Sequence, residues 1–247
     1  MLSVHHRRLK RVGALGKSVW GTDRVTNALS TPQTKRARLN RARVILSAVE
    51  LADRDGYEAL SMRSLSDRLG VVPMALYKHV ADKEDLLDAM LDVVVGEIDF
   101  PSGVGWRESM RKRALSARRA LQRHPWAVGR FETGTPGAAN LAYHNATLGC
   151  LRSDAGLDFG KAIHAYSVLE SYIHGFALQE RAKAPQDVPI ESQRRRAAAI
   201  QRNPDFAVEH PYLMELADEL RTGYDADREF ERGLDLILDG LERLVEQ

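Results

Sequence analysis

Between positions 63 and 79 the sequence carries side chains of the types that contact nucleic acids. Tyr77, Lys78 and His79 follow one another, and each can donate a hydrogen bond to a phosphate oxygen. Met74 is apolar and can touch a thymine methyl group, and Arg63 can make a paired contact with a guanine edge or clamp a phosphate. Arg63 is therefore the leading candidate for reading a base, and the segment predicts contact with duplex DNA.

The sequence gives less support for a phosphate-binding loop, a calcium loop or a histidine metal site. Residues 13–18 (GALGKS) look like a phosphate-binding loop, but Arg11 stands where that motif needs its first glycine. Acidic residues alternate between 225 and 231 as calcium ligands do, yet Phe230 occupies the position that requires glycine. His164 and His174 are ten residues apart, which directs them away from each other on a helix. We therefore expect no catalytic residues, no metal site and no cofactor, with a helical enzyme or scaffold as the alternative.

Four predicted helices position the candidate DNA-contacting residues. Their expected limits are Asn40 to Gly56, Ser61 to Gly70, Pro73 to Val80 and Asp82 to Ile98, with Asn40, Ser61 and Asp82 as caps. The two short helices, joined at a glycine turn, are typical of a helix-turn-helix motif whose second helix enters the major groove. A generic helical bundle is the alternative, because short amphipathic helices are common.

The amino-acid sequence of this segment favours the helix-turn-helix motif over a generic bundle. Residues 39–91 resemble the DNA-binding domain of the tetracycline-repressor (TetR) family along their whole length, through GY at 56–57, LSMR at 60–63, LGV at 69–71, LYKHV at 76–80 and DKEDLL at 82–87. The resemblance implies DNA contacts by Ser61, Arg63, Tyr77, Lys78, His79 and Lys83. For Lys83 a phosphate would explain a cation at the positive end of a helix dipole, with simple solvent exposure as the alternative.

Charge is distributed unevenly along the chain. The net charge is +2, but residues 1–43 contain eleven Lys or Arg and one acidic residue, a net +10. We expect residues 1–38 to be a basic, flexible arm that either contacts the DNA backbone or only aids solubility. The lone Cys150, the lack of an apolar run of bilayer length and the lack of a secretory signal predict a cytoplasmic protein with no membrane partner.

A second domain is expected after a Pro- and Gly-containing break at 99–105. Apolar residues recur at helical spacing in three stripes: Trp106, Met110, Ala114, Ala117 and Leu121; Leu141, Asn145, Leu148 and Leu151; Ile163, Tyr166, Leu169, Ile173 and Phe176. Strand alternation is absent from the sequence. The prediction is an all-α protein with a helix-turn-helix domain at 39–98 and a helical ligand-sensing and dimerisation domain at 106–247.

The second domain also carries polar groups on mostly apolar helices. RHPW at 123–126 and GFALQE at 175–180 resemble the branch of the family that binds tetracycline-like drugs, which implies a small-molecule effector. The candidate ligand-binding residues are His144, Thr147, Tyr166, Tyr172 and His174. The alternative for each of them is a hydrogen bond inside the core or exposure to solvent.

The apolar pattern of the last predicted helix indicates that it packs against another helix. Leu234, Ile237, Leu241 and Leu244 give it a broad apolar face, and the small residues Ala165 and Gly175 would allow close helix approach in a four-helix homodimer interface. A dimer would place two recognition helices on a palindromic operator. The expected function is a repressor that a small-molecule effector releases from DNA, with a regulator that lacks an effector as the second possibility.

Overall fold

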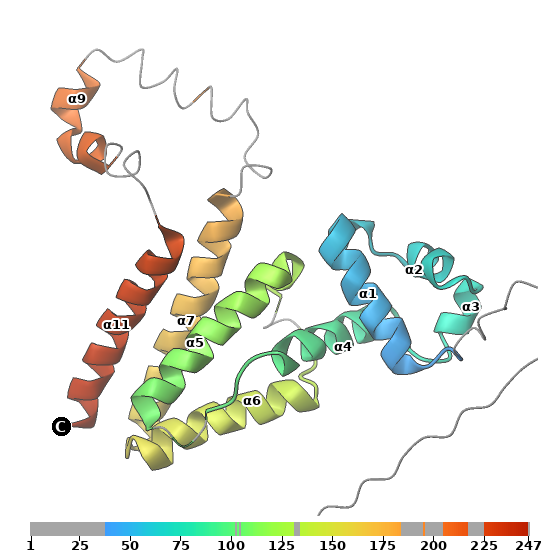
Figure 1. Cartoon of the computed structure of the whole chain (residues 1–247), viewed down its shortest axis with the longest axis horizontal. Helices are drawn as coiled ribbons and strands as arrows, with labels where there is room; N and C mark the ends of the chain where they lie inside the picture. The colour runs from blue at the N-terminus through green and yellow to red at the C-terminus, as the bar shows by residue number, and fades with distance from the viewer. Residues whose placement is uncertain are drawn as a thin grey trace, which may run out of the picture. The chain divides into compact units, whose positions relative to one another are not determined.

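Every regular element in the described part of the chain is a helix, as the sequence predicts (Figure 1). The computed structural model describes residues 38–101, 103, 105–130, 134–183, 195, 205–216 and 225–246. Contacts group residues 39–247 into one unit. The predicted basic arm lies outside the described residues, apart from Arg38. Among the described helices, none has both the length and the apolar character that crossing a bilayer requires.

The first helices have the limits that their capping residues predict. They are α1 (Arg41–Asp55), the 3₁₀ turn η1 (Tyr57–Ala59), α2 (Met62–Leu69), α3 (Pro73–Leu76) and α4 (Lys83–Gly96). Side-chain oxygens of Asn40, Ser61 and Asp82 accept the N–H groups that would otherwise be unpaired at the starts of α1, α2 and α4. Gly70 adopts the left-handed conformation with φ of 65° and so ends α2 at the turn.

The helix predicted from Pro73 to Val80 is shorter than expected. Helix α3 ends at Leu76, because residues 77–79 form a turn in which the N–H groups of His79 and Val80 both donate to the Leu76 carbonyl. Leu76 and Val80 are nevertheless buried, at 0% and 2% exposure. The predicted inward face is therefore confirmed, although the turn carries part of it.

The remaining helices make up the second predicted region. They are α5 (Trp106–Arg123), the 3₁₀ turn η2 (Pro125–Ala127), α6 (Ala138–Gly149), the π-helical turn η3 (Cys150–Asp154), α7 (Phe159–Lys183), α9 (Phe206–Glu209) and α11 (Ala226–Val245). Helix α5 packs against α7 and α11, while α6 packs against α4 (Figure 1). Helix α11 buries Phe230, Leu234, Leu238 and Leu241, which confirms its predicted apolar face.

Two predicted apolar stripes are wrong in part. On α6 the buried residues are Tyr143 and Thr147, whereas Leu141 is 58% exposed, because the α6 face toward the core carries a polar network. On α7 Leu169 and Ile173 are buried as predicted, but Ile163 is 42% exposed and small alanines fill the tight contacts instead. One of these is Ala165, which is fully buried within its own subunit and so cannot provide the predicted close approach between subunits.

Candidate DNA-binding surface and ligand cavity

The start of α2 exposes two of the predicted DNA-contacting residues. Ser61 is exposed, and its hydroxyl accepts the Ser64 N–H at 3.0 Å while the Ser64 hydroxyl accepts the Ser61 N–H at 2.9 Å. This reciprocal cap fixes the backbone where α2 begins. Arg63, the second residue of α2, is exposed and can reach a ligand outside the helix.

Helix α3 and the turn after it present an unusual mixture of side chains. Met74 is 71% exposed, Val72 is 68% exposed and Tyr77 is 46% exposed, with Lys78 exposed beside them and His79 half-buried. Apolar side chains this open to water, next to a lysine and a tyrosine, are suited to a partner with both methyl groups and anionic oxygens. The major groove of DNA offers both.

An ion pair between Arg41 and Asp85, which the sequence did not predict, stabilises this turn. The Arg41 guanidinium donates to the His79 carbonyl at 2.6 Å and to both oxygens of Asp85 at 3.0 and 2.7 Å. Hydrogen bonds to Asp85 from Arg41 and from the Ala81 N–H lower the pKa of Asp85 to about 2. The turn that carries Tyr77, Lys78 and His79 is thus tied to both α1 and α4.

Lys83, the first residue of α4, is exposed. Its Nζ lies 4.7 Å from the centre of the Tyr57 ring, and the Arg130 guanidinium lies 3.8 Å from the same ring. Cations are attracted to the faces of aromatic rings. Tyr57 therefore holds the lysine near the start of α4, where a phosphate could also reach it.

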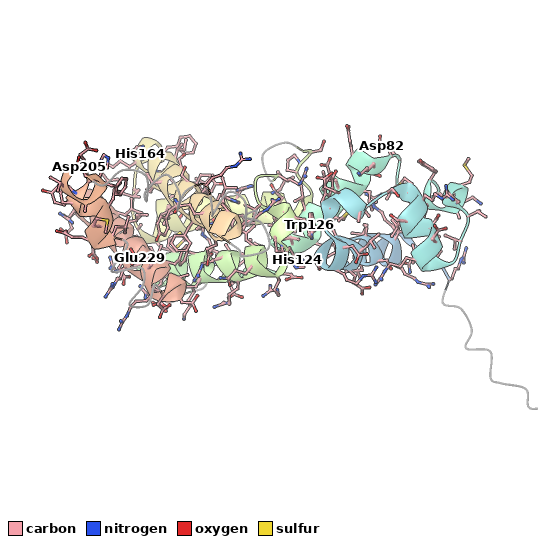
Figure 2. The ribbon with its side chains drawn as sticks, turned by 90° about the horizontal axis from the view of Figure 1, so that it is seen from above. Asp82, His124, Trp126, His164, Asp205 and Glu229 are labelled. Carbon is pink, nitrogen blue, oxygen red and sulfur yellow. The ribbon has the colours of Figure 1, made fainter. Side chains whose placement is uncertain are left out.

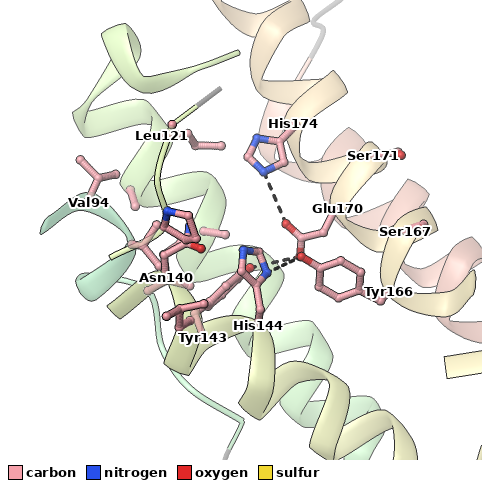
Figure 3. Close-up of a pocket in the computed structure, with 17 residues that line it drawn as sticks. Val94, Leu121, Asn140, Tyr143, His144, Tyr166, Ser167, Glu170, Ser171 and His174 are labelled. Atoms are coloured by element: carbon pink, nitrogen blue, oxygen red, sulfur yellow. Dashed lines mark hydrogen bonds and ion pairs between the residues drawn. The ribbon is translucent and has the colours of Figure 1, made fainter. Parts of the chain in front are cut away.

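The second candidate site is a cavity of about 460 Å³ bounded by α4, α5, α6 and α7 (Figure 3). One wall is apolar and the other polar. The lining residues are Val94, Val95, Ile98, Ala117, Ala120, Leu121, Gly134, Pro136, Asn140, Leu141, Tyr143, His144, Tyr166, Ser167, Glu170, Ser171 and His174. Apolar walls with a few converging polar groups are typical of small-molecule sites.

Two hydrogen-bonded groups form the polar wall (Figure 3). In the first, the Tyr166 hydroxyl bonds His144 Nδ1, and burial lowers the pKa of His144. In the second, Glu170 lies 3.4 Å from His174 Nε2 and accepts from the fully buried Arg113 at 2.5 Å and from the Tyr143 hydroxyl at 3.2 Å.

The second group keeps a charge inside the protein. Burial alone would raise the pKa of Glu170, but the hydrogen bond from His174 and the charge of Arg113 outweigh it and lower the pKa to about 2. Glu170 is therefore an ionised carboxylate at neutral pH, and it neutralises the buried guanidinium. The polar wall combines a paired carboxylate with neutral donors and acceptors from His144 and Tyr143.

Three of the five predicted ligand-binding residues line the cavity, namely His144, Tyr166 and His174. The other two do not. The Thr147 hydroxyl donates to the Tyr143 carbonyl within α6, and the Tyr172 hydroxyl donates to the Phe230 carbonyl of α11 at 2.9 Å. Both are polar groups that the fold uses for its own packing.

Sequence reasoning also missed lining residues that share faces with those it found. On α6, Asn140 and Tyr143 lie four and one residues before His144, and on α7 Glu170 lies midway between Tyr166 and His174. The spacing of four residues along α7 was the signal that could have identified Glu170. Among the described residues, His, Cys, Asp and Glu form no group that could hold a metal ion.

Comparison with known proteins agrees with this geometry. The sequence profile described as "Bacterial regulatory proteins, tetR family" matches residues 44–90, and "Tetracyclin repressor-like, C-terminal domain" matches residues 101–245. The Escherichia coli tetracycline repressor of class C is 32% identical over 214 residues, which cover 84% of this chain and 92% of that protein. The predicted family is therefore confirmed.

Two further relatives extend the comparison. A helix-turn-helix transcriptional regulator of Saccharopolyspora erythraea is 34% identical over 151 residues, which cover 60% of this chain and 64% of that protein. The crystal structure of the Streptomyces coelicolor TetR-family protein ActR in complex with actinorhodin has a TM-score of 0.69 and 28% identity, and the match covers 85% of this chain and all of that one. The chain belongs to the TetR family of DNA-binding transcriptional repressors.

Proposed function

We propose that this repressor binds a palindromic operator as a homodimer in the cytoplasm and leaves it when a small molecule fills the cavity of Figure 3. One observation carries the proposal. Helix α4 begins at Lys83, four residues after the end of the turn that carries Tyr77 and Lys78, and its other end lines the cavity through Val94 and Val95. A single helix thus joins the candidate DNA-binding surface to the candidate ligand site.

The start of α6 is fastened to the middle of α4. Asp88 accepts the Thr135 N–H at 3.0 Å, and Asp92 accepts the Asn140 N–H at 2.9 Å. The approach is so close that a Cβ atom added at Gly137 would overlap the Asp92 carboxylate. Because Asn140 also lines the cavity, a ligand that shifts the start of α6 must also move or release α4.

On the DNA side we assign roles by exposure and chemistry. Arg63 reads a base, Met74 contacts an apolar edge, and Tyr77, Lys78 and His79 contact phosphates. Lys83 meets a phosphate at the start of α4. Ser61, whose hydroxyl caps α2, contributes at most a further phosphate contact from the same atom.

On the ligand side we assign His144, Tyr166 and His174, together with Asn140 and Glu170, to effector recognition. The related ActR binds actinorhodin, which supports a small-molecule effector here too. Burial lowers the pKa of His144 and so favours the neutral imidazole, whose ring offers one N–H and one lone pair for hydrogen bonds.

Exposed apolar residues on α7 and α11 support the homodimer. Phe159, Ile163 and Leu178 of α7 are 61%, 42% and 55% exposed, and Leu236 of α11 is 74% exposed. Gly175 has no atom within 4 Å of an added Cβ, so the middle of α7 leaves room for another helix. Pairing of α7 and α11 with the same helices of a second subunit would cover these residues.

Selection of bound duplexes from a random DNA pool by the purified protein tests the DNA half of the proposal. We expect enrichment of a palindrome whose half-sites are about one helical turn or a multiple apart, with affinity that falls steeply as salt rises. A screen for compounds that release the selected duplex then tests the ligand half. A pool without enrichment would refute specific operator binding, and a cavity-binding compound that releases no DNA would favour a regulator without an effector.

A further inference from the structure

A short segment after α5 contacts the first helix of the DNA-binding region. His124 is 6% exposed, and its Nδ1 lies 2.8 Å from Asp53 Oδ1 on α1. Its Nε2 lies 3.3 Å from Glu97 Oε2, directly after α4. The Trp126 indole N–H donates to the same Asp53 oxygen at 2.7 Å. Figure 2 shows His124 and Trp126 where the end of α5 meets α1.

A third side chain extends the contact to η1. Arg130 stacks on the Tyr57 ring at 3.8 Å, and its Nη2 lies 3.8 Å from Glu58. Its Nε donates to the Trp126 carbonyl at 3.1 Å, which closes the segment on itself. We call residues 124–130 the docking turn, because three of its side chains hold the end of α1 and η1.

The docking turn lies between two parts of the cavity wall. Leu121, three residues before it, and Gly134, four residues after it, both line the cavity. A ligand that displaces Leu121 would act on the docking turn through the last turn of α5. The docking turn therefore joins a cavity-lining part of α5 to α1.

The contact of His124 with Asp53 and Glu97 depends on the protonation state of its imidazole. Both ring nitrogens face carboxylate oxygens, and an ionised carboxylate only accepts hydrogen bonds. A neutral imidazole carries one N–H and can satisfy one carboxylate, whereas an imidazolium satisfies both. Burial opposes ionisation of Glu97, but hydrogen bonds from Arg123 and His124 outweigh it and lower the pKa of Glu97.

The other charged groups around His124 do not replace the missing proton. Arg123 binds the same Glu97 oxygen at 2.5 Å, but it does not reach Asp53 in the described contacts. Arg181 of α7 donates to the Pro125 carbonyl at 3.5 Å. When His124 is neutral, one of its two nitrogens presents a lone pair to a carboxylate, and the contact weakens.

We propose that His124 is a positioning residue that fixes the DNA-binding helices on the ligand-binding region, and that its imidazolium form does so most firmly. The inference rests on the proposed function, because two recognition helices match two half-sites only if each is held in place. Operator affinity should then be lower when the His124 ring has lost its second proton, because only one of the two carboxylates keeps its hydrogen bond.

The test compares His124→Gln with the wild-type protein, and His210→Gln, at an exposed histidine directly after α9, is the matched control. From about pH 6 to about pH 8, we expect wild-type and His210→Gln proteins to lose roughly tenfold in operator affinity, the size of one charge-assisted hydrogen bond. His124→Gln should lose clearly less over the same range, as should Asp53→Asn. An equal pH profile in His124→Gln and wild type would overturn the proposal.

A second readout needs no DNA. Trp126 packs edge-to-face on His124, with ring centres 6.2 Å apart, so its fluorescence should follow the proton on His124. We expect a pH-dependent component in the wild type and in His210→Gln that disappears in His124→Gln. If this component is present but no duplex binds at any pH, the proposed function fails while the inference on the contact stands. If the component is the same in all three proteins, the inference fails.

Discussion

Arg63 and Lys83 have different roles in the proposed complex with DNA, and substitution separates them. Arg63→Ala should cost roughly 1–3 kcal/mol of operator affinity and relax the preference at one base, because a paired contact to a base edge is lost. Lys83→Ala should weaken operator and random duplexes alike and reduce the salt slope by about 1, because only a phosphate contact is lost. Titrations of both duplexes at several salt concentrations, with Arg228→Ala on α11 as control, measure this. Identical effects of the two substitutions would contradict the assignment.

His144 and Tyr172 are both polar aromatic residues of the second region, but only His144 lines the cavity. His144→Phe keeps a ring against Tyr143 and Tyr166 and should lower effector affinity roughly tenfold through one lost hydrogen bond. Tyr172→Phe should leave effector affinity unchanged and cost about 1 kcal/mol of folding stability, because it loses the bond to the Phe230 carbonyl. Calorimetric titration and chemical denaturation distinguish the two. A large loss of effector affinity in Tyr172→Phe would place the ligand elsewhere.

At the residue scale, the sequence predicts which side chains are exposed better than it predicts which side chains they pair with. Arg63 and Met74 lie on faces that α2 and α3 leave exposed, so helical periodicity is enough to predict the exposure of both residues. Periodicity does not reveal the brace from Arg41 to Asp85, because the two residues are 44 positions apart and both read as ordinary helix-surface charges. The same holds for Arg113, which looks solvated in a basic helix but is fully buried against Glu170.

At the scale of elements, the bonds from α4 to the start of α6 carry the coupling between ligand and DNA. Asp92→Ala removes the acceptor of the Asn140 N–H and should leave effector binding within about threefold of wild type, since Asp92 does not line the cavity. The ratio of operator affinities without and with effector should shrink, because α6 no longer holds α4. Asp235→Ala, which loses a surface ion pair between α11 and α5, is the control. An unchanged ratio in Asp92→Ala would exclude this route.

The first and last residues of the helices were largely predictable from the sequence. Which face of a helix is buried was less predictable, as α6 shows. Asn40, Ser61, Asp82 and Gly70 act within four residues of themselves, so local chemistry is enough to place the ends of α1, α2 and α4. The inward face of α6 depends on Tyr143 reaching the Arg113–Glu170 pair, which joins three helices. The spacing of hydrophobic residues does not reveal such a polar contact in the core. The prediction from spacing therefore placed Leu141 on the buried face of α6.

At the scale of the whole molecule, the exposed residues of α7 and α11 predict the oligomeric state. Ile163→Glu together with Leu236→Glu should convert a dimer to monomers in sedimentation experiments, because two charges cannot be buried unpaired in an apolar interface. Operator affinity should fall by about a hundredfold or more, since a monomer engages one half-site. Leu46→Glu, at a similarly exposed leucine of α1, should remain dimeric. A dimeric double variant would move the interface to another surface.

Filling the cavity should reduce operator binding, and fluorescence anisotropy of a labelled operator measures this effect. The protein is titrated onto the selected duplex with and without a compound whose binding His144→Phe weakens, so that occupancy of the cavity is independently known. We predict that saturating compound lowers operator affinity by at least about tenfold, which corresponds to about 1.4 kcal/mol of coupling. Equal operator affinity with the cavity full and empty would refute ligand-controlled repression by this protein.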